Sequence, residues 1–248
     1  MNSILKIKNL KKTYHNKDGE TLAVKNFTFN LNEGEFIAIV GPSGCGKSTI
    51  LSILAGIDDK SSGNIKIEDN KKIGYMLQLD CLFNFRTVLD NCLLGLEINK
   101  ELNDENKKYV IDLLNTYGLK DFMYKYPNEL SGGMRQRVAL IRTLATKPDI
   151  LLLDEPYSAL DYQTRLAVSD DVYNIIKKEK KSVIMVTHDI AEAISMADKV
   201  VVLSHRPSEI KEIIDINLTN KTTPINNRKA KEFSTYYEKI WKAIDYHV

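Results

Sequence analysis

Short runs of apolar residues recur along the chain, and their spacing predicts strands that alternate with helices. Near the start, apolar positions alternate with polar ones over Leu5–Leu10 and again at Phe27, Phe29 and Leu31, which predicts half-buried antiparallel strands. Four further runs are continuously apolar, as strands buried on both faces are: Glu35–Val40, Ile150–Leu153, Ser182–Val186 and Val200–Leu203. Helical stretches such as Ser48–Ala55 lie between them, and buried strands that alternate with helices indicate a parallel α/β sheet.

Residues 85–145 break this alternation. They contain no strong strand run, and apolar residues recur at helical spacing in Asn106–Leu119 and Met134–Ala145. We therefore expect 85–145 to form a helical subdomain. It would be inserted into an α/β core made of residues 1–84 and 146–205.

The last residues, 206–248, form a predicted C-terminal appendage. This segment is polar at first and then carries an amphipathic helical stripe of Phe233, Tyr237, Trp241 and Ile244. Packing of the stripe on the chain's own domain is the favoured interpretation. Binding to a partner or lying on a membrane surface is the alternative.

Composition and charge narrow the class of protein. Of 248 residues, 43% are hydrophobic and 27% charged, and 35 basic against 33 acidic residues give a formal net charge of +2. This near-balance provides no electrostatic footprint for nucleic acid, so we expect no nucleic-acid partner. No run reaches the roughly 20 apolar residues that cross a bilayer. Met1–Lys12 is too polar for a signal peptide, which predicts a cytoplasmic chain whose three cysteines are reduced thiols.

The strongest chemical signal is the segment GPSGCGKST, which follows an apolar run and opens a helix. Its glycines let consecutive backbone N–H groups turn toward one phosphate, and the helix directs its positive end to the same anion. In this motif Lys47 reaches the β- and γ-phosphates and the Ser48 hydroxyl binds Mg²⁺. Thiols at helix N-termini can have a lowered pKa, but we expect Cys45 to contribute only its backbone. The expected phosphate-binding residues are Gly41, Pro42, Ser43, Gly44, Cys45, Gly46, Lys47, Ser48 and Thr49.

Two carboxylates close the apolar run Ile150–Leu153. Asp154 and Glu155 would lie at the C-terminal end of a buried parallel strand, where α/β folds bind ligands. In a chain that also has a phosphate-binding loop, Asp154 is interpreted as holding Mg²⁺, commonly through water. Glu155 is interpreted as the general base that polarises the attacking water. An acidic helix cap is the alternative interpretation of the pair.

A second glycine pair marks another helix start. Leu130–Met134 has the sequence LSGGM, and Ser131 with two glycines before a helix is another anion-binding arrangement. In a chain with a phosphate-binding loop, this arrangement suggests a nucleotide held from both sides. At this point the sequence closely resembles the ATP-binding subunits of ABC transporters. Their signature motif is LSGGQ, whereas here Met134 takes the fifth position and Gln136 follows two residues on.

The resemblance covers residues 4–205 and implies a P-loop NTPase fold with a RecA-like core, an antiparallel β subdomain and an inserted helical subdomain. It also implies a head-to-tail homodimer that encloses ATP and Mg²⁺. The chain would hydrolyse ATP at the cytoplasmic face of the cell membrane as a peripheral protein. It would dock on an integral membrane permease and depend indirectly on a solute-binding protein. The residues expected to face the phosphate loop of the second copy are Ser131, Gly132, Gly133, Met134 and Gln136.

Other positions acquire roles only through this resemblance. Tyr14 matches the aromatic residue that stacks on adenine, Gln78 the glutamine that contacts Mg²⁺ and water, and His188 the histidine that contacts the γ-phosphate. Ser158 and Asp161 match the segment that crosses the dimer interface. A core tyrosine, a surface glutamine and a structural histidine are the alternatives. The expected catalytic residues are thus Lys47, Glu155 and His188, and the expected metal ligands are Ser48, Gln78 and Asp154.

Segments outside the common motifs resemble one class of importer ATPases. Leu79–Val88, Gly95–Ile98 and His205–Ile210 resemble the nitrate, sulfonate and taurine class, although Phe85 replaces the tryptophan usual there. ATPases for thiamine-precursor pyrimidines belong to the same broad group, and an efflux or lipoprotein-release ATPase would differ mainly in its permease. A soluble ABC ATPase would need coiled coils, tandem modules or a basic surface. A small-molecule kinase would need an acceptor pocket, and LSGGM and His188 disfavour it.

The connection after Gln78 predicts a docking surface. Leu82, Phe83 and Phe85 are unusually apolar for a link between subdomains, and exposed apolar patches mark binding surfaces. We therefore expect a short permease helix to enter the groove between core and insert near these residues. The alternative is that their side chains are buried under the insert.

Overall fold

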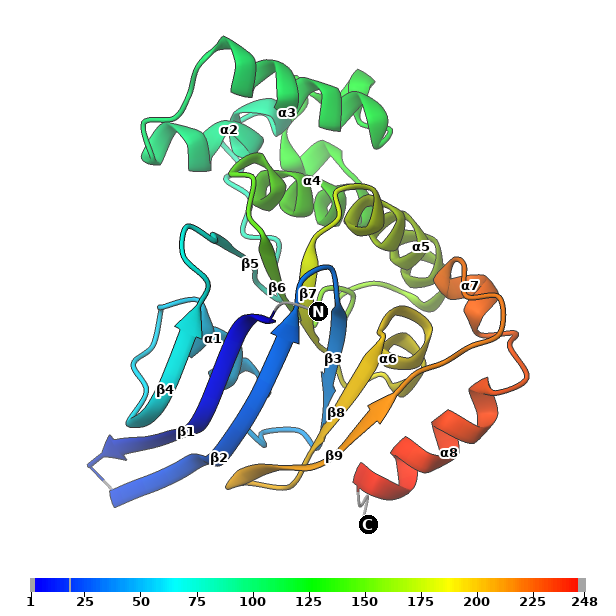
Figure 1. The fold of residues 1–248 in the computed structure, drawn as a ribbon. Helices are drawn as coiled ribbons and strands as arrows, with labels where there is room; N and C mark the ends of the chain where they lie inside the picture. The colour runs from blue at the N-terminus through cyan, green and yellow to red at the C-terminus, as the bar shows by residue number, and fades with distance from the viewer. Residues whose placement is uncertain (1–2, 18, 245–248) are drawn as a thin grey trace.

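The computed structural model describes residues 3–17 and 19–244 (Figure 1). Residues 1–2 belong to the segment expected to lack a signal peptide, and residues 245–248 belong to the predicted appendage; both lie outside the described residues. Within the described part, no helix is long and apolar enough to cross a membrane.

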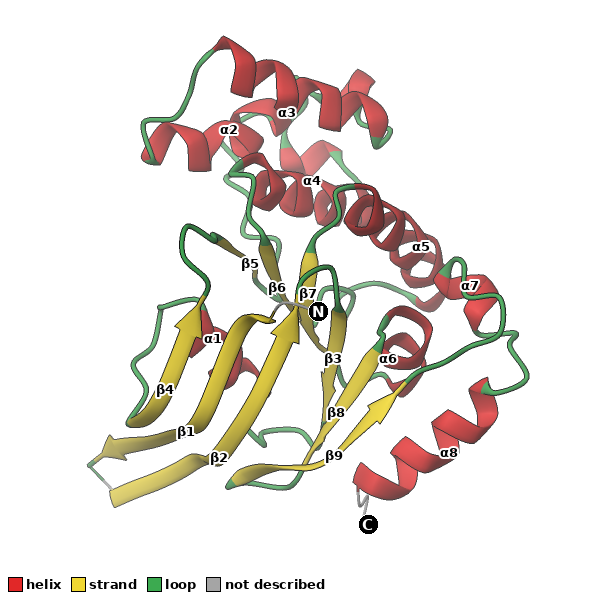
Figure 2. Ribbon diagram, in the orientation of Figure 1, coloured by secondary structure: helices red, strands yellow, loops and turns green. Residues whose placement is uncertain are grey.

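Nine strands join in one sheet over residues 3–17 and 19–244 (Figure 2). Along the chain they are β1 (Ser3–Asn16), β2 (Gly19–Asn32), β3 (Phe36–Val40), β4 (Ser62–Ile67), β5 (Ile73–Met76), β6 (Ile150–Asp154), β7 (Ser182–Val186), β8 (Lys199–Leu203) and β9 (Ser208–Asp215). Their order across the sheet is β4-β1-β2-β9-β8-β3-β7-β6-β5. From β8 to β5 neighbouring strands run parallel, whereas β1 pairs antiparallel with both β2 and β4.

The parallel strands are apolar throughout because both faces of the sheet are covered. In β3, Phe36, Ala38 and Val40 join the core on one face, and Ile37 and Ile39 join the core on the other. The first core is completed by helices of the insert and of the second half of the chain, and the second by α1 (Lys47–Leu54) and the antiparallel strands. Successive strand residues point to opposite faces, so each position needs an apolar side chain.

Helices α2 (Val88–Ile98), α3 (Asp104–Thr116) and α4 (Gly132–Ala145) gather beyond one end of the sheet (Figure 1). Short 3₁₀ turns at Lys120–Phe122 and Pro127–Glu129 connect α3 to α4. The side chains of Thr87, Asn103 and Ser131 cap the three helices by accepting a backbone N–H, which satisfies a donor that has no partner within the helix. The division of the chain into core, insert and appendage remains a prediction.

Four helices follow α4 in the described residues up to 244: α5 (Tyr162–Lys178), α6 (Ile190–Met196), α7 (Pro224–Asn227) and α8 (Phe233–Ile244). Helix α8 packs on α6 and β8, with Ile240 and Ile244 buried. Tyr237 and Trp241, also part of the predicted stripe, are exposed and stack on each other with ring centroids 6.3 Å apart. The stripe is therefore divided between the core and the surface.

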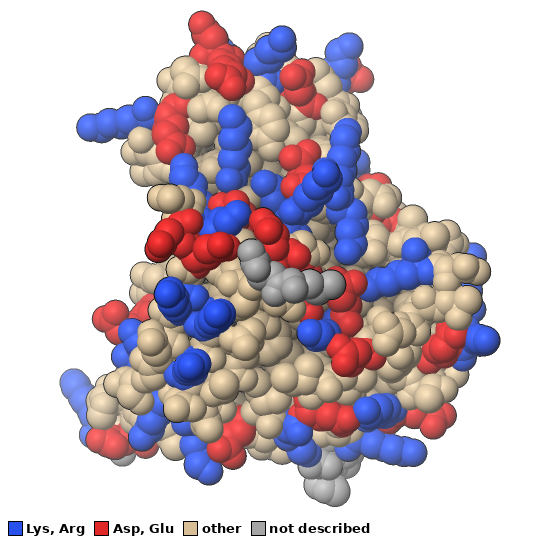
Figure 3. All heavy atoms as spheres, in the orientation of Figure 1, with Lys and Arg blue, Asp and Glu red and all other residues tan. Residues whose placement is uncertain are grey.

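Acidic and basic side chains are interspersed on the face drawn in Figure 3. This distribution matches the nearly equal numbers of basic and acidic residues in the sequence. The face therefore presents mixed charge rather than a field of one sign.

Candidate functional site

The loop between β3 and α1 has the conformation of an anion-binding loop. Gly44 and Gly46 have φ angles of +71° and +113°, values that side-chain-bearing residues rarely adopt. A Cβ atom at Gly46 would also lie 3.3 Å from the carbonyl oxygen of Ala23. The turn leads directly into the N-terminus of α1, so backbone N–H groups and the helix end act on the same space.

Lys47 lies inside this loop. Its side chain is buried, and Nζ donates hydrogen bonds of 2.9 Å to the carbonyl oxygens of both Gly41 and Pro42. These bonds hold a positive charge within the loop, where it can exchange carbonyl partners for phosphate oxygens.

Asp154 ends β6 beside the same loop. The Ser48 hydroxyl donates to Asp154 Oδ1 at 3.0 Å, and the Tyr75 hydroxyl donates to Asp154 Oδ2 at 3.0 Å. Burial of the carboxyl group raises the pKa of Asp154, which these hydrogen bonds partly oppose. The sequence predicted Ser48 and Asp154 together, but it gave no indication of Tyr75, which approaches through the pairing of β5 with β6.

Glu155 lies just beyond β6 in a left-handed backbone conformation, with a φ of +43°. Its N–H donates to the carbonyl oxygen of Val186 at 2.9 Å, which ties this turn to β7. Carboxylate Oε2 lies 3.1 Å from His188 Nδ1 and 3.4 Å from Gln78 Nε2. A side chain in this backbone region is strained, a feature often found at active sites.

These residues line one open cleft of about 640 Å³. The loop contributes one wall, and Gln78, Glu155 and His188 contribute the other, so the cleft brings together residues from four separate segments predicted from sequence or resemblance. The lining residues are Gly41, Ser43, Gly44, Gly46, Lys47, Ser48, Thr49, Gln78, Glu155 and His188.

Cys45 does not line this cleft. Its thiol is buried, and burial raises the pKa of Cys45 despite the nearby Lys47 ammonium. A raised thiol pKa opposes thiolate chemistry. The geometry thus agrees with a backbone contribution from this position.

Tyr14 lies at the edge of the cleft rather than in its lining. Its hydroxyl donates to Asp58 at 2.7 Å and lies 3.4 Å from the hydroxyl of Thr49, which does line the cleft. The ammonium of Lys12 lies 4.6 Å from the ring centroid and also pairs with Asp58. Lys12 and Asp58 carry no motif, and only the fold shows that they fix the orientation of this ring.

The signature segment Ser131–Met134 does not line the cleft of the same chain. Ser131 caps α4 by accepting from the Met134 N–H at 3.3 Å, and Gly133 packs so closely that a Cβ there would lie 2.8 Å from Val168. Gln136 is only 4% exposed, and its Oε1 has no hydrogen-bond partner among residues 3–17 and 19–244. The Gln136 side chain is therefore buried behind the surface that Ser131 presents.

The segment after Glu155 crosses from β6 to α5. Ser158 donates from both its N–H and its hydroxyl to the carbonyl oxygen of Glu155, each at 3.1 Å. The Asp161 carboxylate caps α5 by accepting from the Thr164 N–H at 3.0 Å. Residues 158–161 form the turn between these two hydrogen-bonded positions, and Ala159 and Asp161 are exposed in it.

The connection that follows Gln78 is attached to α4. Arg135 Nε forms an ion pair with Asp80 Oδ2 at 3.0 Å. Arg142, seven residues further along α4, donates to the backbone carbonyl oxygens of Asp80 and Cys81. Two arginines on one helix therefore hold this connection.

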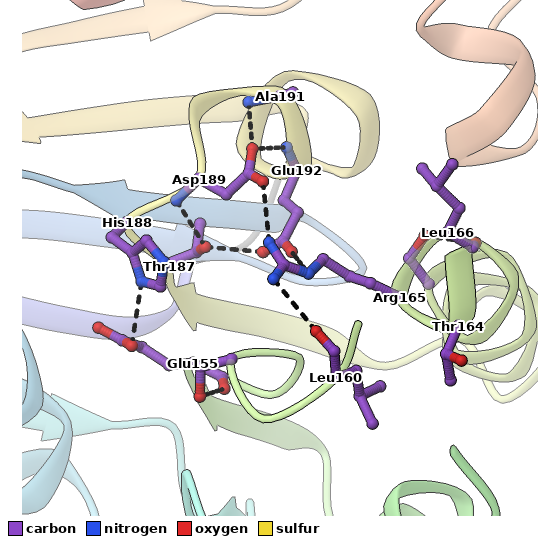
Figure 4. Close-up of polar contacts among 12 residues, drawn as sticks. Glu155, Leu160, Thr164, Arg165, Leu166, Thr187, His188, Asp189, Ala191 and Glu192 are labelled. Carbon is purple, nitrogen blue, oxygen red and sulfur yellow. Dashed lines mark hydrogen bonds and ion pairs between the residues drawn. The ribbon is translucent and has the colours of Figure 1, made fainter. Parts of the chain in front are cut away.

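A buried carboxylate lies behind His188 (Figure 4). Glu192, on α6, is 3% exposed and accepts a hydrogen bond from the Thr187 hydroxyl at 2.7 Å. The charged groups that face it are Arg165 from α5, Asp189 at the N-cap of α6 and Arg228 at the C-cap of α7. Burial outweighs the two arginines and raises the pKa of Glu192 to about 7.

We expect Glu192 to make folding stability depend on pH. Because its folded pKa of about 7 exceeds the ordinary glutamate pKa of 4.5, the folded chain retains a proton that the unfolded chain has released between these two values. The stability of the wild type should therefore fall as pH rises from about 4.5 to 7. By the linkage relation, the total loss is about 3 kcal/mol.

Denaturant unfolding of the wild type and of Glu192→Gln across pH 4.5–8.0 measures this effect. The stability of Glu192→Gln relative to wild type should rise with pH through this window. Exposed Glu238→Gln is the charge control and should show no comparable trend. A pH-independent difference for Glu192→Gln would contradict the assigned pKa.

The strand–loop–helix arrangement around Lys47, with Asp154 at the end of β6, a parallel strand separated from β3 by β7 alone, defines a P-loop nucleotide-binding protein. The ABC transporter family profile matches residues 24–158. The chain therefore belongs to the ATP-binding subunits of ABC transporters, the ATPases that couple ATP hydrolysis to solute transport across a membrane.

Relatives match along nearly the whole chain. An uncharacterised ABC transporter ATP-binding protein of Bacillus subtilis, YtlC, is 44% identical, covering 98% of this chain and 96% of its own. The nitrate import ATP-binding protein NrtD of Synechocystis is 37% identical, covering 95% and 93%. The aliphatic sulfonates import ATP-binding protein SsuB of Bacillus thuringiensis is 39% identical, covering 88% and 89%.

The fold matches solved structures of the same family. A dimeric post-hydrolysis structure of the ATP-binding cassette MJ0796, bound to ADP and Pi, superimposes with a TM-score of 0.73 at 32% identity. The match covers 86% of this chain and 99% of that one. The expected α/β fold of P-loop NTPases is confirmed.

Proposed function

We propose that this chain powers the import of a small anionic or organic solute, such as nitrate, a sulfonate or taurine. The observation that carries the proposal is the sequence similarity, at 37% and 39% identity over most of the chain, to ATP-binding proteins named for nitrate and for aliphatic sulfonate import. A peripheral position at the cytoplasmic face of the membrane, a permease and a solute-binding protein complete the proposed system.

In this proposal the loop Gly41–Thr49 binds the phosphates of ATP, with Lys47 at the β- and γ-phosphates. The donor set beside it fits Mg²⁺, because Ser48 Oγ and Asp154 Oδ1 are hard oxygen atoms that lie 3.0 Å apart. Ser48 and Asp154 would hold the ion, with Gln78 on the opposite wall of the cleft. When bound, the ion neutralises charge on the phosphate oxygens. Tyr14 is proposed to stack on adenine.

Glu155 is proposed as the general base for hydrolysis. It is the carboxylate of the cleft that reaches both His188 and Gln78, so it can accept a proton from a water located between these polar groups. His188 is proposed to contact the γ-phosphate and to orient Glu155 through their 3.1 Å contact. Gln78 would position the same water.

A second copy of the chain is proposed to complete the cleft. The signature segment Ser131–Met134 lies outside the cleft of its own chain, yet it presents an exposed serine at a helix N-terminus, which suits a phosphate from another copy. Ser158 and Asp161 would lie on the same interface. Gln136 is excluded from this set because it is buried.

The permease is proposed to dock beside the connection after Gln78. Phe83 and Phe85 are 42% and 77% exposed, with ring centroids 5.3 Å apart, whereas Leu82 is buried and is excluded from the docking surface. Buried Asn91 holds the loop in this shape by donating to the carbonyl oxygens of Phe83, Arg86 and Thr87. A groove of about 570 Å³ between β5, α2 and α4 borders the insert.

We expect Phe85→Asp to abolish assembly and transport while leaving the isolated subunit intact. Phe85 is largely exposed, so a carboxylate there has little folding cost, but it would be desolvated in an apolar interface. Basal ATPase activity should stay within about twofold of wild type, since changes at exposed sites away from the cleft have small effects. Thermal unfolding and ATPase assays of the subunit, with permease co-purification, measure these outcomes.

Ile213→Asp on β9 is the matched control, because Ile213 is also an exposed apolar residue. It should retain permease binding. Unfolding of Phe85→Asp as an isolated subunit would place Phe85 in the core and move the docking site elsewhere.

The solute class is tested in vesicles that contain the subunit, its permease and the solute-binding protein. ATP-dependent uptake of labelled nitrate, taurine or an aliphatic sulfonate supports the proposal, and Phe85→Asp should prevent it. ATP-dependent efflux, or uptake restricted to solutes of other classes, would refute the proposed import function while leaving the family assignment in place.

A further inference from the structure

Arg165, in the first turn of α5, contacts three separate parts of the chain (Figure 4). Its Nη2 donates to the carbonyl oxygen of Leu160 at 3.3 Å, and its Nη1 pairs with Asp189 Oδ2 at 3.4 Å. Its Nε lies 3.8 Å from Glu192 Oε1. The guanidinium group therefore lies between the turn that follows Glu155 and the loop that carries His188.

The loop around His188 is fixed on both sides by residues of this cluster. Asp189 Oδ1 accepts the N–H groups of Ala191 and Glu192, which caps α6, while its other oxygen is bound by Arg165. On the other side, the Thr187 hydroxyl accepts the Asp189 N–H at 3.0 Å and donates to Glu192. The backbone that carries His188 has little freedom to shift while Asp189 remains bound to Arg165.

These contacts form a closed circuit that begins and ends at Glu155. The Glu155 carbonyl oxygen is bound by Ser158, and the turn continues to Leu160, whose carbonyl oxygen is bound by Arg165. Arg165 binds Asp189, the neighbour of His188, and His188 Nδ1 lies 3.1 Å from Glu155 Oε2. Arg165 is the link that joins the two arms of the circuit.

Only an arginine side chain provides this link. The guanidinium group is planar, always charged and presents several N–H donors in a fixed fork, so it can donate to the Leu160 carbonyl and to Asp189 while its charge lies beside Glu192. The Arg165 side chain is 21% exposed, and its two acidic partners are 24% and 4% exposed, so bulk water replaces these contacts poorly.

We propose that Arg165 is a positioning residue for ATP hydrolysis. It holds the turn Ser158–Asp161 and the His188 loop at a fixed distance, and thereby keeps His188 and Glu155 aligned. Because Ser158 and Asp161 are proposed to face the second copy, Arg165 also transmits the position of that interface to the Glu155–His188 pair. The inference rests on the proposed roles of Glu155 and His188.

We expect Arg165→Ala to lower kcat by about 10- to 100-fold, the size of effect that a small misplacement of catalytic groups produces. The affinity for ATP should stay within about twofold of wild type, because the polar partners of Arg165 in the described residues, Leu160, Asp189 and Glu192, lie outside the phosphate loop. Steady-state kinetics and equilibrium nucleotide binding measure the two quantities separately.

Arg137→Ala on α4 is a closely matched control. The Arg137 side chain is 25% exposed, pairs with Asp171 at 3.7 Å and donates to the carbonyl oxygen of Tyr117 at 3.3 Å. It thus loses a similar ion pair and a similar carbonyl bond away from the cleft. Arg137→Ala should lose thermal stability but keep kcat within about twofold of wild type.

Arg165→Lys separates alignment from folding. Lysine retains the positive charge beside Asp189 and Glu192 but lacks the fork that also binds Leu160, so the variant should fold and recover only part of kcat. The inference is overturned if folded Arg165→Lys and Arg165→Ala both keep wild-type kcat. It is also overturned if Arg137→Ala loses as much kcat for the same loss of thermal stability.

Glu155→Gln, assayed in parallel, distinguishes this inference from the proposal on which it rests. Loss of turnover in Glu155→Gln with normal turnover in Arg165→Ala rejects the positioning role alone. Normal turnover in Glu155→Gln rejects the proposed role of Glu155 itself, and with it the reason for aligning the pair.

Discussion

Replacing Glu155 by glutamine should leave ATP binding intact and reduce ATP turnover by about 10²- to 10⁴-fold, the contribution expected of a general base. Glutamine keeps the shape of the side chain and can still contact His188 and Gln78, but it cannot accept a proton. Single-turnover hydrolysis and nucleotide binding, measured on the same preparation, distinguish loss of chemistry from loss of affinity.

The same variant should accumulate as an ATP-bound dimer. The cleft is open in the single chain, and the signature segment Ser131–Met134 lies outside it, so the nucleotide itself is proposed to bridge two copies. Without nucleotide the chain should be monomeric or weakly associated. Light scattering with and without saturating ATP measures the change in mass, and Glu238→Gln serves as the charge control. A Glu155→Gln protein that stays monomeric with saturating ATP would be incompatible with the proposed dimer.

Replacing Lys47 by alanine should weaken ATP binding by about 100-fold, since hydrogen bonds to charged groups contribute about 1.5–3 kcal/mol. Lys47 holds its ammonium within the loop through the carbonyl oxygens of Gly41 and Pro42, at the place proposed for the phosphates. Isothermal titration with ATP and Mg²⁺ measures the loss directly.

Lys221→Ala is the control that distinguishes a loss of ATP affinity from the loss of stability caused by removing a hydrogen-bonded lysine. Lys221 also donates to a backbone carbonyl oxygen, that of Ala197, and pairs with Asp198, each at 2.7 Å, but it does not line the cleft. This control should lose stability and keep its affinity for ATP. An affinity of Lys47→Ala within threefold of the wild-type value would exclude the proposed phosphate contact.

The sequence revealed four of the five parallel strands, β3, β6, β7 and β8, because these are buried on both faces. Strands β4, β5 and β9 were not predicted. β5 is a four-residue strand at the end of the sheet, and β9 mixes charged and apolar residues because it is only partly buried. Such strands are recognised through their pairing partners rather than through their own pattern.

The cleft residues were likewise predicted where their own sequence pattern was sufficient and missed where they depend on contacts with distant segments. Contiguous motifs around Lys47 and Asp154 were evident from sequence, because adjacent residues act together there. Tyr75 and Arg165 were not, since their contacts depend on strand register and on helix packing. The role predicted for Gln136 ignored helix geometry: residues two positions apart lie on different faces of a helix, so Met134 and Gln136 cannot both face a second copy.

The two arginine contacts from α4 to Asp80 and Cys81 have a mechanical consequence. The same helix begins at the signature segment and contacts the backbone that leads from Gln78 to Phe85, so we expect these parts to move together. A tilt of α4 when ATP is bound or released would therefore move the attached segment that carries the exposed rings of Phe83 and Phe85. The stiffness of residues 78–85 would thus determine how much of the movement of α4 is passed on to the proposed permease contact.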